Sequence, residues 1–213
     1  MVNKDSIEEN RTGAVILAGG DSKRLGRPKA LLTYGEKTLI EHMVSHLGAM
    51  FSEITIVTDR QELYSHLPVK LASDLIGQKE KSPLRGIHAG LSASDLPYQF
   101  FAACDMPMLN LQLIAYMSRY APAYDAVVPC VGTYYQPLHA FYSRRCIQEI
   151  ENVFTSGNFK VTSFYEQVAI RRIEEEEIAR FDPAQLSFTN INTWKDYEAL
   201  LGLRAEVCPG TEK

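Results

Sequence analysis

Short apolar segments alternate with amphipathic segments along residues 13–201. Residues 14–17 are a short apolar run bounded by glycines, which predicts a strand, and residues 98–103 have the nearly continuous apolar character of a central strand covered on both faces. Further strands are predicted at residues 53–58, 69–71, 126–129, 138–142 and 168–173.

Apolar residues at helical spacing fill the intervals between these strands. Thr38-x-x-Glu41 has the form of a capping box, and the apolar positions from Leu39 to Leu47 recur at helical spacing before Gly48. Pro83 suits a first helical turn. Further helices are predicted at residues 61–67, 83–91, 144–153, 158–166 and 194–201. This alternation predicts an α/β sandwich with a mainly parallel sheet.

A single domain is predicted over residues 13–201, because the pattern contains no linker, repeat or low-complexity segment. The chain has 213 residues, which is enough for one domain with a substantial core. Residues 1–12 and 203–213 are polar and lack periodic apolar positions. We expect them to form a flexible N-terminal arm and a C-terminal tail.

Composition and charge narrow the class of protein. Apolar residues make up 46% of the chain and charged residues 23%, as in ordinary globular proteins. A net charge of −4 argues against a nucleic-acid binder, which would carry a basic surface. The chain has no apolar run of the ~18 residues that a membrane span needs, and its first ten residues do not resemble a secretory signal. We therefore expect a cytoplasmic protein without nucleic-acid or membrane partners.

Cysteines and histidines give no sign of a metal centre or a disulfide framework. The four cysteines are widely spaced and include no C-x-x-C pair, which favours a reducing compartment. The five histidines do not form a metal-binding motif, and we interpret His88 and His139 as packed polar residues.

A glycine-rich turn and a basic run follow the first predicted strand. Gly19 and Gly20 permit a tight turn that brings amide N–H groups close to a ligand. Four cations then lie within seven positions: Lys23, Arg24, Arg27 and Lys29. Amides and cations at the carboxyl end of a strand suit a polyphosphate, although the spacing fits neither a Walker A loop nor G-x-G-x-x-G. The alternative is a surface turn with a solvated basic run.

Asp105 comes directly after the strongest predicted central strand. Because ligands of open α/β sheets bind at the carboxyl ends of the strands, this carboxylate is expected to face the glycine turn. A carboxylate beside bound phosphates is a suitable ligand for Mg²⁺. The alternative is an Asp that caps the following helix.

Four motifs together resemble the molybdenum cofactor guanylyltransferases of the nucleotidyltransferase family. They are Leu17-Ala-Gly-Gly-x-Ser-x-Arg24-Leu-Gly-x-x-Lys29, Ser82-Pro-Leu-Arg-Gly86, Cys104-Asp-Met-Pro107 and Asn190-Ile-Asn-Thr193. The resemblance implies a three-layer, Rossmann-like fold with a mainly parallel central sheet. It also implies transfer of GMP from Mg-GTP to the molybdopterin form of the cofactor, with release of pyrophosphate.

The resemblance also implies a role for individual residues. Lys29, Arg24 and Asp105 would be catalytic, with Asp105 as the Mg²⁺ ligand. The nucleotide would contact Leu17, Ala18, Gly19, Gly20, Lys29, Thr58, Asp74 and Asp105. Asn190 and Asn192 would lie on the pterin side. Each role has a structural alternative: Asp74 as a turn residue, Thr58 as a strand residue, and the Asn190–Thr193 motif as an Asx turn or helix cap.

Other functions remain open at this point. They are a cytidylyltransferase for the same cofactor, a sugar-phosphate nucleotidyltransferase, and a non-catalytic carrier of the pterin cofactor. Gly19-Gly20 and the Asn190–Thr193 motif favour guanylyl transfer, and the presence of Lys29 and Asp105 disfavours a carrier. GTP and the molybdopterin cofactor are the expected substrates, while other cofactor-biosynthesis proteins and molybdoenzyme apoproteins are candidate partners.

Overall fold

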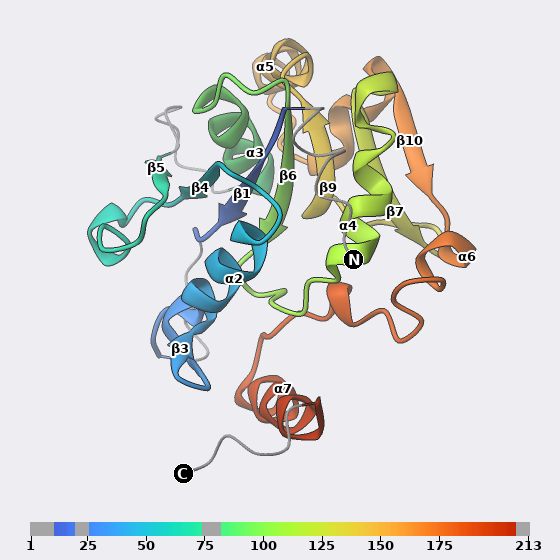
Figure 1. The fold of residues 1–213 in the computed structure, drawn as a ribbon. Helices are drawn as coiled ribbons and strands as arrows, with labels where there is room; N and C mark the ends of the chain where they lie inside the picture. Colours follow the sequence, from blue (N-terminus) through green and yellow to red (C-terminus); the bar gives the residue numbers. More distant parts are fainter. Residues whose placement is uncertain (1–10, 20–25, 74–81, 208–213) are drawn as a thin grey trace.

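A single eight-stranded sheet forms the centre of the molecule (Figure 1). The computed structural model describes residues 11–19, 26–73 and 82–207. The sheet order is β10-β7-β9-β6-β1-β4-β5, with β8 paired to β7. The strands are β1 (Thr12–Leu17), β4 (Ile54–Val57), β5 (Lys70–Ala72), β6 (Tyr98–Ala103), β7 (Ala126–Val131), β8 (Tyr134–Tyr135), β9 (His139–Ser143) and β10 (Ile170–Ile173). Only the pairings of β9 with β6 and β7, and of β8 with β7, are antiparallel, so the predicted mainly parallel sheet is confirmed.

Helices cover both faces of the sheet and make three layers. Side chains alternate along β1, so that Ile16 packs on the face with α2 (Leu39–Gly48) and α4 (Leu111–Ser118). Val15 packs on the opposite face with α3 (Pro83–Ser92) and α5 (Cys146–Thr155). The expected three-layer α/β arrangement is therefore present.

The predicted capping signals act as expected. Thr38 and Glu41 form a reciprocal capping box at α2, and Ser82 caps α3 with Pro83 in the first turn. Gly90 lets α3 approach the sheet closely, because a Cβ there would lie 2.7 Å from Val15 Cγ1 and 2.8 Å from Phe101 Cε1.

Two predicted helices are wrong in type. Residues 61–67 contain only the 3₁₀ turn η2 (Gln61–Leu63), and the prediction at residues 158–166 overlaps the 3₁₀ segment η4 (Val161–Gln167). Both segments are short, so the cost of nucleating an α-helix is not recovered by propagation. In η4 the adjacent Phe164 and Tyr165 are both buried, whereas an amphipathic α-helix buries positions three or four apart.

Helix α4 is a further difference from the prediction, which placed no helix there. Apolar residues surround much of α4, so its helical period is weak in the sequence. The available signal was Asn110, whose side chain accepts hydrogen bonds from the amides of Gln112 (2.9 Å) and Leu113 (3.0 Å). The hairpin of β2 (Thr33–Tyr34) and β3 (Lys37–Thr38) was also missed.

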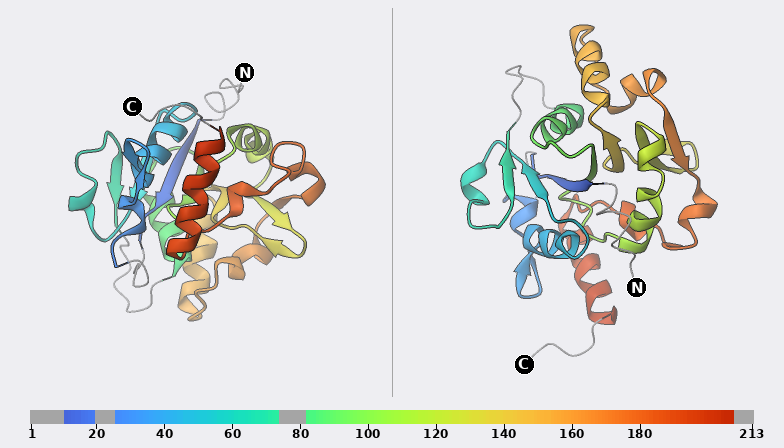
Figure 2. Two further views of the ribbon diagram at one scale, coloured as in Figure 1. Left: turned by 90° about the horizontal axis from the view of Figure 1, so that it is seen from below. Right: turned by 45° about the horizontal axis from the view of Figure 1, so that its top comes forward.

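The chain ends with α7 (Trp194–Val207), after the short helix α6 (Glu175–Ile178) and the 3₁₀ turn η5 (Leu186–Phe188). Figure 2 shows α7 across the end of the sheet. A small apolar cluster attaches it to the segment before α2, with Leu32 and Leu39 packed against Ile191, Tyr197 and Leu200.

The predicted limits of the arm and tail need correction at their inner ends. β1 already begins at Thr12, and α7 continues to Val207 rather than ending before a tail at residue 203. Within the described part of the chain, helices are too short or too polar to cross a membrane.

Candidate active site

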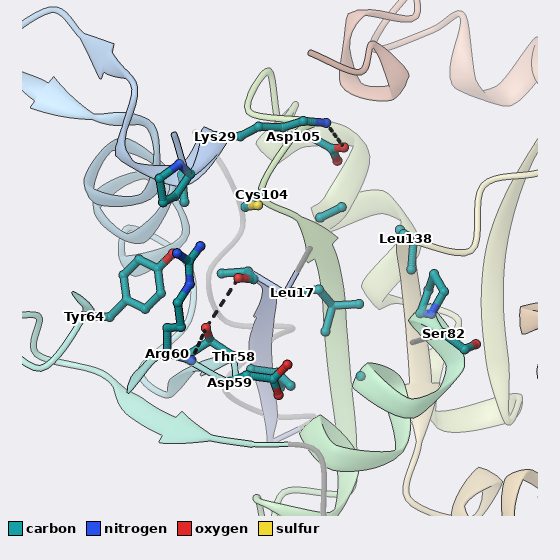
Figure 3. A pocket seen from close by; sticks show the side chains of 18 residues that line it. Leu17, Lys29, Thr58, Asp59, Arg60, Tyr64, Ser82, Cys104, Asp105 and Leu138 are labelled. Atoms are coloured by element: carbon teal, nitrogen blue, oxygen red, sulfur yellow. Dashed lines mark hydrogen bonds and ion pairs between the residues drawn. The ribbon is translucent and has the colours of Figure 1, made fainter. Parts of the chain in front are cut away.

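Three adjacent strands end at the same level and bring the candidate residues to one edge of the sheet. Leu17 at the end of β1 is in register with Val57 at the end of β4 and with Ala103 at the end of β6. The residues that follow these strands therefore meet, and they line a cavity of about 320 Å³ (Figure 3). This edge is where open α/β sheets bind their ligands.

The glycine turn is held in place by its backbone. The amide of Ala18 donates to the carbonyl of Val57 (2.9 Å), and the amide of Cys104 donates to the carbonyl of Leu17 (3.0 Å). No described atom lies within 4 Å of the position that a Cβ on Gly19 would take, and the φ angle of Gly19 is not in the left-handed region. The described part of the chain therefore leaves the space beside Gly19 open. Gly20 and Arg24 lie outside the described residues.

Lys29 lies at the start of η1 (Lys29–Leu31) and joins two of the predicted motifs. Its ammonium is 3.1 Å from Asp105 Oδ2 and donates to Asn192 Oδ1 at 2.7 Å. The Lys29 and Asp105 side chains are 18% and 26% exposed, so the ion pair is sheltered yet reachable from the cavity. A cation, a carboxylate and an amide are thus brought together from three distant segments.

Asp105 does not cap the helix that follows it. Asn110 caps α4, and Asp105 lies in the turn directly after β6, where it lines the cavity. Its carbonyl accepts a hydrogen bond from the amide of Ile191 (2.8 Å), which ties the Asn190–Thr193 motif to the end of β6. The carboxylate itself is left to interact with Lys29 and with whatever enters the cavity.

Asp105 is also the residue to which the resemblance assigns a divalent metal ion. In the part of the chain that the structure describes, no three His, Cys, Asp or Glu residues gather into a metal-binding group. A single carboxylate is nevertheless sufficient for Mg²⁺ in proteins when substrate phosphates and water supply the remaining oxygens. The donor set of the described residues therefore fits Mg²⁺ bound together with a nucleotide better than a metal ion held by protein side chains alone.

Cys104 follows β6 and also lines the cavity. Burial raises the pKa of its thiol to about 12, and the neighbouring Asp105 carboxylate acts in the same direction. The thiol therefore stays protonated at neutral pH and is a poor nucleophile. The arrangement indicates positioning and charge stabilisation rather than covalent catalysis by Cys104.

The opposite wall of the cavity follows β4. Thr58 is buried, and its hydroxyl donates to the carbonyl of Ala18 (3.4 Å) and accepts from the amide of Arg60 (3.1 Å). These bonds connect Thr58, which directly follows β4, to the glycine turn. Asp59, Arg60 and Tyr64 line the same wall and were missed by sequence reasoning, although the first two directly follow Thr58 at a strand end. Asp74 lies outside the described residues.

The segment that begins at Ser82 provides the third wall. The Ser82 side chain accepts from the amide of Leu84 (3.1 Å) and donates to the carbonyl of Phe159 (2.6 Å). Gly86 lines the cavity, and a Cβ there would approach Leu17 Cδ2 to 3.1 Å. Ser82 therefore acts as a helix cap, and Gly86 permits close helix–sheet packing. Arg85 is buried within α3 and does not line this cavity.

The Asn190–Thr193 motif has the helix-cap role that was one of the two interpretations made from the sequence, and the pterin-side role stays a prediction. Thr193 Oγ1 accepts from the amide of Asp196 (3.2 Å), and the Asp196 carboxylate accepts from the amides of Asn192 and Thr193, both at 2.8 Å. These backbone hydrogen bonds lower the pKa of Asp196. The motif thus caps α7 while leaving the Asn192 side chain to reach Lys29. Asn190 is exposed, and neither asparagine lines the cavity itself.

Comparisons with known proteins show the family of this chain. Residues 14–172 match the family model of the MobA-like NTP transferase domain. A protein of Peptoclostridium acidaminophilum named "Probable molybdenum cofactor guanylyltransferase" is 39% identical, covering 86% of this chain and 85% of its own. The molybdenum cofactor guanylyltransferase of Syntrophotalea carbinolica is 37% identical, covering 87% of this chain and 88% of its own.

Solved structures show the same fold. The molybdopterin-guanine dinucleotide biosynthesis protein A of Archaeoglobus fulgidus superposes with a TM-score of 0.79 at 24% identity, covering 91% of this chain and 99% of the other. A CMP:2-keto-3-deoxy-manno-octonic acid synthetase complexed with CTP superposes with a TM-score of 0.69 at 15% identity, covering 93% and 100%. From the family match and the sequence relatives together, the chain belongs to the molybdenum cofactor guanylyltransferases, which are nucleotidyltransferase enzymes with the MobA-like fold.

Proposed function

We propose that this enzyme transfers GMP from GTP to the terminal phosphate of the molybdopterin cofactor. A phosphate oxygen of the cofactor would attack the α-phosphorus of GTP, and the bond between that phosphorus and the bridging oxygen to the β-phosphate would break. The products are the guanine dinucleotide form of the cofactor and pyrophosphate. Because the acceptor supplies its own nucleophile, the protein needs no covalent intermediate.

The observation that carries this proposal is the position of Lys29 between Asp105 and Asn192. Asp105 and Lys29 line the cavity beside the glycine turn, which suits a triphosphate. Asn192 belongs to the motif that the family resemblance assigns to the pterin side. Lys29 is therefore in reach of the place where the two substrates must meet, and its charge suits the phosphates of both.

The roles of the residues follow from their chemistry. Amides at the turn around Gly19 would hold phosphate oxygens, and Lys29 would neutralise charge on the transferred phosphate and the leaving pyrophosphate. Asp105 would hold Mg²⁺, which supplies Lewis-acid stabilisation of the phosphate charge when bound. On the resemblance alone, Gly20 and Asp74 are retained as nucleotide-binding candidates, Arg24 as a catalytic candidate, and Asn190 as a candidate on the pterin side.

Further expectations belong to the same proposal. We infer a cytoplasmic enzyme whose residues 13–201 act as one nucleotidyltransferase domain, with GTP and molybdopterin as substrates. Cofactor-biosynthesis proteins and molybdoenzyme apoproteins are the expected protein partners, and nucleic acids and membranes are not. The cytoplasmic setting is supported by the widely spaced cysteines, because their pattern does not predict the disulfide framework that is common in secreted domains.

Release of pyrophosphate from Mg-GTP in the presence of molybdopterin tests the proposed reaction. The kcat/KM for GTP should exceed those for CTP and ATP, because a site that hydrogen-bonds guanine leaves polar groups unpaired with another base. Omission of molybdopterin is the control. A preference for CTP would indicate a cytidylyltransferase, release only with sugar phosphates would indicate a different acceptor, and tight cofactor binding without release would indicate a carrier.

A further inference from the structure

Arg27 and Trp194 form a second contact between the segments that Lys29 and Asn192 already join. Arg27 Cζ lies 5.5 Å from the centroid of the Trp194 ring, within the range of a cation–π interaction. The contact lies two residues before Lys29 in one segment and two residues after Asn192 in the other. Segment 27–29 is therefore attached to segment 192–194 at both ends.

Pro28 makes the connection between Arg27 and Lys29 stiff. Its φ and ψ angles are −56° and 126°, and its ring restricts φ to this region. Arg27 and Lys29 flank this restricted residue, and each contacts the far segment. Fixing Arg27 on that segment therefore also limits how far Lys29 can move relative to it.

Trp194 is itself held firmly. It begins α7 directly after Thr193, whose cap bonds with Asp196 fix the backbone of residues 192–194. Its ring also packs against Tyr197, at a centroid distance of 5.8 Å and an interplanar angle of 71°. The Tyr197 side chain is 8% exposed and its hydroxyl donates to the carbonyl of Thr33. The indole is thus a rigid support despite being 44% exposed.

We propose that Trp194 and Arg27 are positioning residues that hold Lys29 between Asp105 and Asn192. Neither of them lines the cavity, so they act through Lys29 rather than on the nucleotide. Arg27 is then excluded from the set of triphosphate-binding cations that the basic run suggested. The inference rests on the proposed transfer reaction for its kinetic consequence, but the contact can be followed independently of turnover.

Kinetics of single and double variants test the coupling. Trp194→Leu and Arg27→Gln should each lower kcat/KM for GTP by about two- to five-fold, the size expected from one exposed cation–π contact. The double variant should be no worse than either single variant, because both changes remove one interaction. Trp194→Phe, which keeps an aromatic face, should recover much of the loss.

A Lys29→Ala background shows whether Trp194 acts through Lys29. In that background Trp194→Leu should have no further effect on kcat/KM. A further loss would show that the indole acts on a substrate directly, for example by stacking on a flat heterocycle, and would overturn the proposal. Tyr134→Leu is the matched control, because Tyr134 is the other large exposed aromatic residue, 76% exposed, and does not line the cavity.

Fluorescence separates this inference from the proposed function. Trp194 is the only tryptophan in the chain, so the emission comes from one indole and reports on its surroundings, which include Arg27. Emission should change in Arg27→Gln, and titration with Mg-GTP should change it in the wild type but not in Arg27→Gln. Unchanged emission in Arg27→Gln, or additive kinetic effects, would overturn the positioning role. Emission that behaves as expected in an enzyme that releases no pyrophosphate would contradict the proposed reaction and leave the contact supported.

Discussion

The Lys29 ammonium donates to the Asn192 side-chain oxygen at 2.7 Å, although the two residues are 163 positions apart in the chain. The bond links the phosphate-binding side of the cavity to the motif before α7. A backbone hydrogen bond from the amide of Ile191 to the carbonyl of Asp105 (2.8 Å) joins the same two parts of the chain. Charge at the reaction centre and the position of the last helix are therefore coupled.

Loss of the Asn192 acceptor should weaken this coupling. A hydrogen bond to a charged group contributes about 1.5–3 kcal/mol, so Asn192→Ala should lower kcat/KM for molybdopterin about tenfold or more. GTP binding should change much less, since Asp105 still holds Lys29. Steady-state kinetics with each substrate varied in turn measures both effects.

Thr193→Ala is the matched control for Asn192. It removes the hydroxyl that caps α7 and should cost about 0.5–2 kcal/mol of unfolding free energy. Activity per folded molecule should remain near that of the wild type. If Asn192→Ala behaved like Thr193→Ala, with lower stability and normal activity, Asn192 would be a structural residue only.

Asp105→Asn should abolish most turnover while the protein remains folded. The substitution keeps the size of the side chain but removes the charge that pairs with Lys29 and would hold Mg²⁺. Losing one preorganised electrostatic contact typically costs about 10²–10³-fold in kcat. Single-turnover rates across a Mg²⁺ titration provide the measurement, and near-normal rates at ordinary Mg²⁺ would place the metal ligand elsewhere.

Two glycine substitutions should affect different properties: Gly19→Ala should weaken GTP binding, and Gly90→Ala should lower stability. Gly19→Ala adds a methyl group where no described atom lies within 4 Å, so the melting temperature should hardly change while GTP binding weakens. Gly90→Ala places a Cβ 2.7 Å from Val15 Cγ1, and overpacking of this kind costs about 1–3 kcal/mol. Thermal unfolding and GTP affinity, measured for both variants, distinguish a ligand-facing glycine from a packing glycine. Normal GTP affinity in Gly19→Ala would argue against the phosphate role of this turn.

His139 should make the protein less stable in mild acid. The ring is fully buried between Phe100 and Phe188, and burial lowers its pKa to about 3, against a weaker opposing effect of Asp182. Between pH 6.5 and 3 the unfolded chain binds a proton that the folded protein excludes. Unfolding free energy should therefore fall as pH decreases, by up to about 1.4 kcal/mol per pH unit.

Urea unfolding between pH 7 and 5 tests this effect. Carboxylates whose pKa is lowered in the fold, such as Glu41 and Glu177, stabilise the protein in their charged form. That stability is lost mainly below the measured pH range, as they become protonated. His139→Leu should flatten the pH dependence in the measured range. An equally steep dependence in this variant would assign the effect to other groups.

Strands and capped helices were predictable because their signals are local. Residues 98–103 form β6 as the apolar run indicated, and Thr38 with Glu41 caps α2 through contacts three positions apart. Helix α4 was not predictable from periodicity, since its buried environment removes the polar face that would mark the period. The two α-helix predictions at residues 61–67 and 158–166 were wrong for a related reason, because short segments take their conformation from the residues they pack against.

The sequence alone determined the chemistry available at this site: a glycine turn, a cluster of cations and a carboxylate after a strand. Strand order decided that Gly19, Thr58 and Asp105 share one edge, because only the register of β4, β1 and β6 brings their ends to the same level. Tertiary structure likewise separated Lys29, which faces Asp105, from Arg27, which lies on Trp194. Local sequence cannot specify such choices, because a flexible cationic side chain takes its orientation from whichever distant partner the fold places within reach.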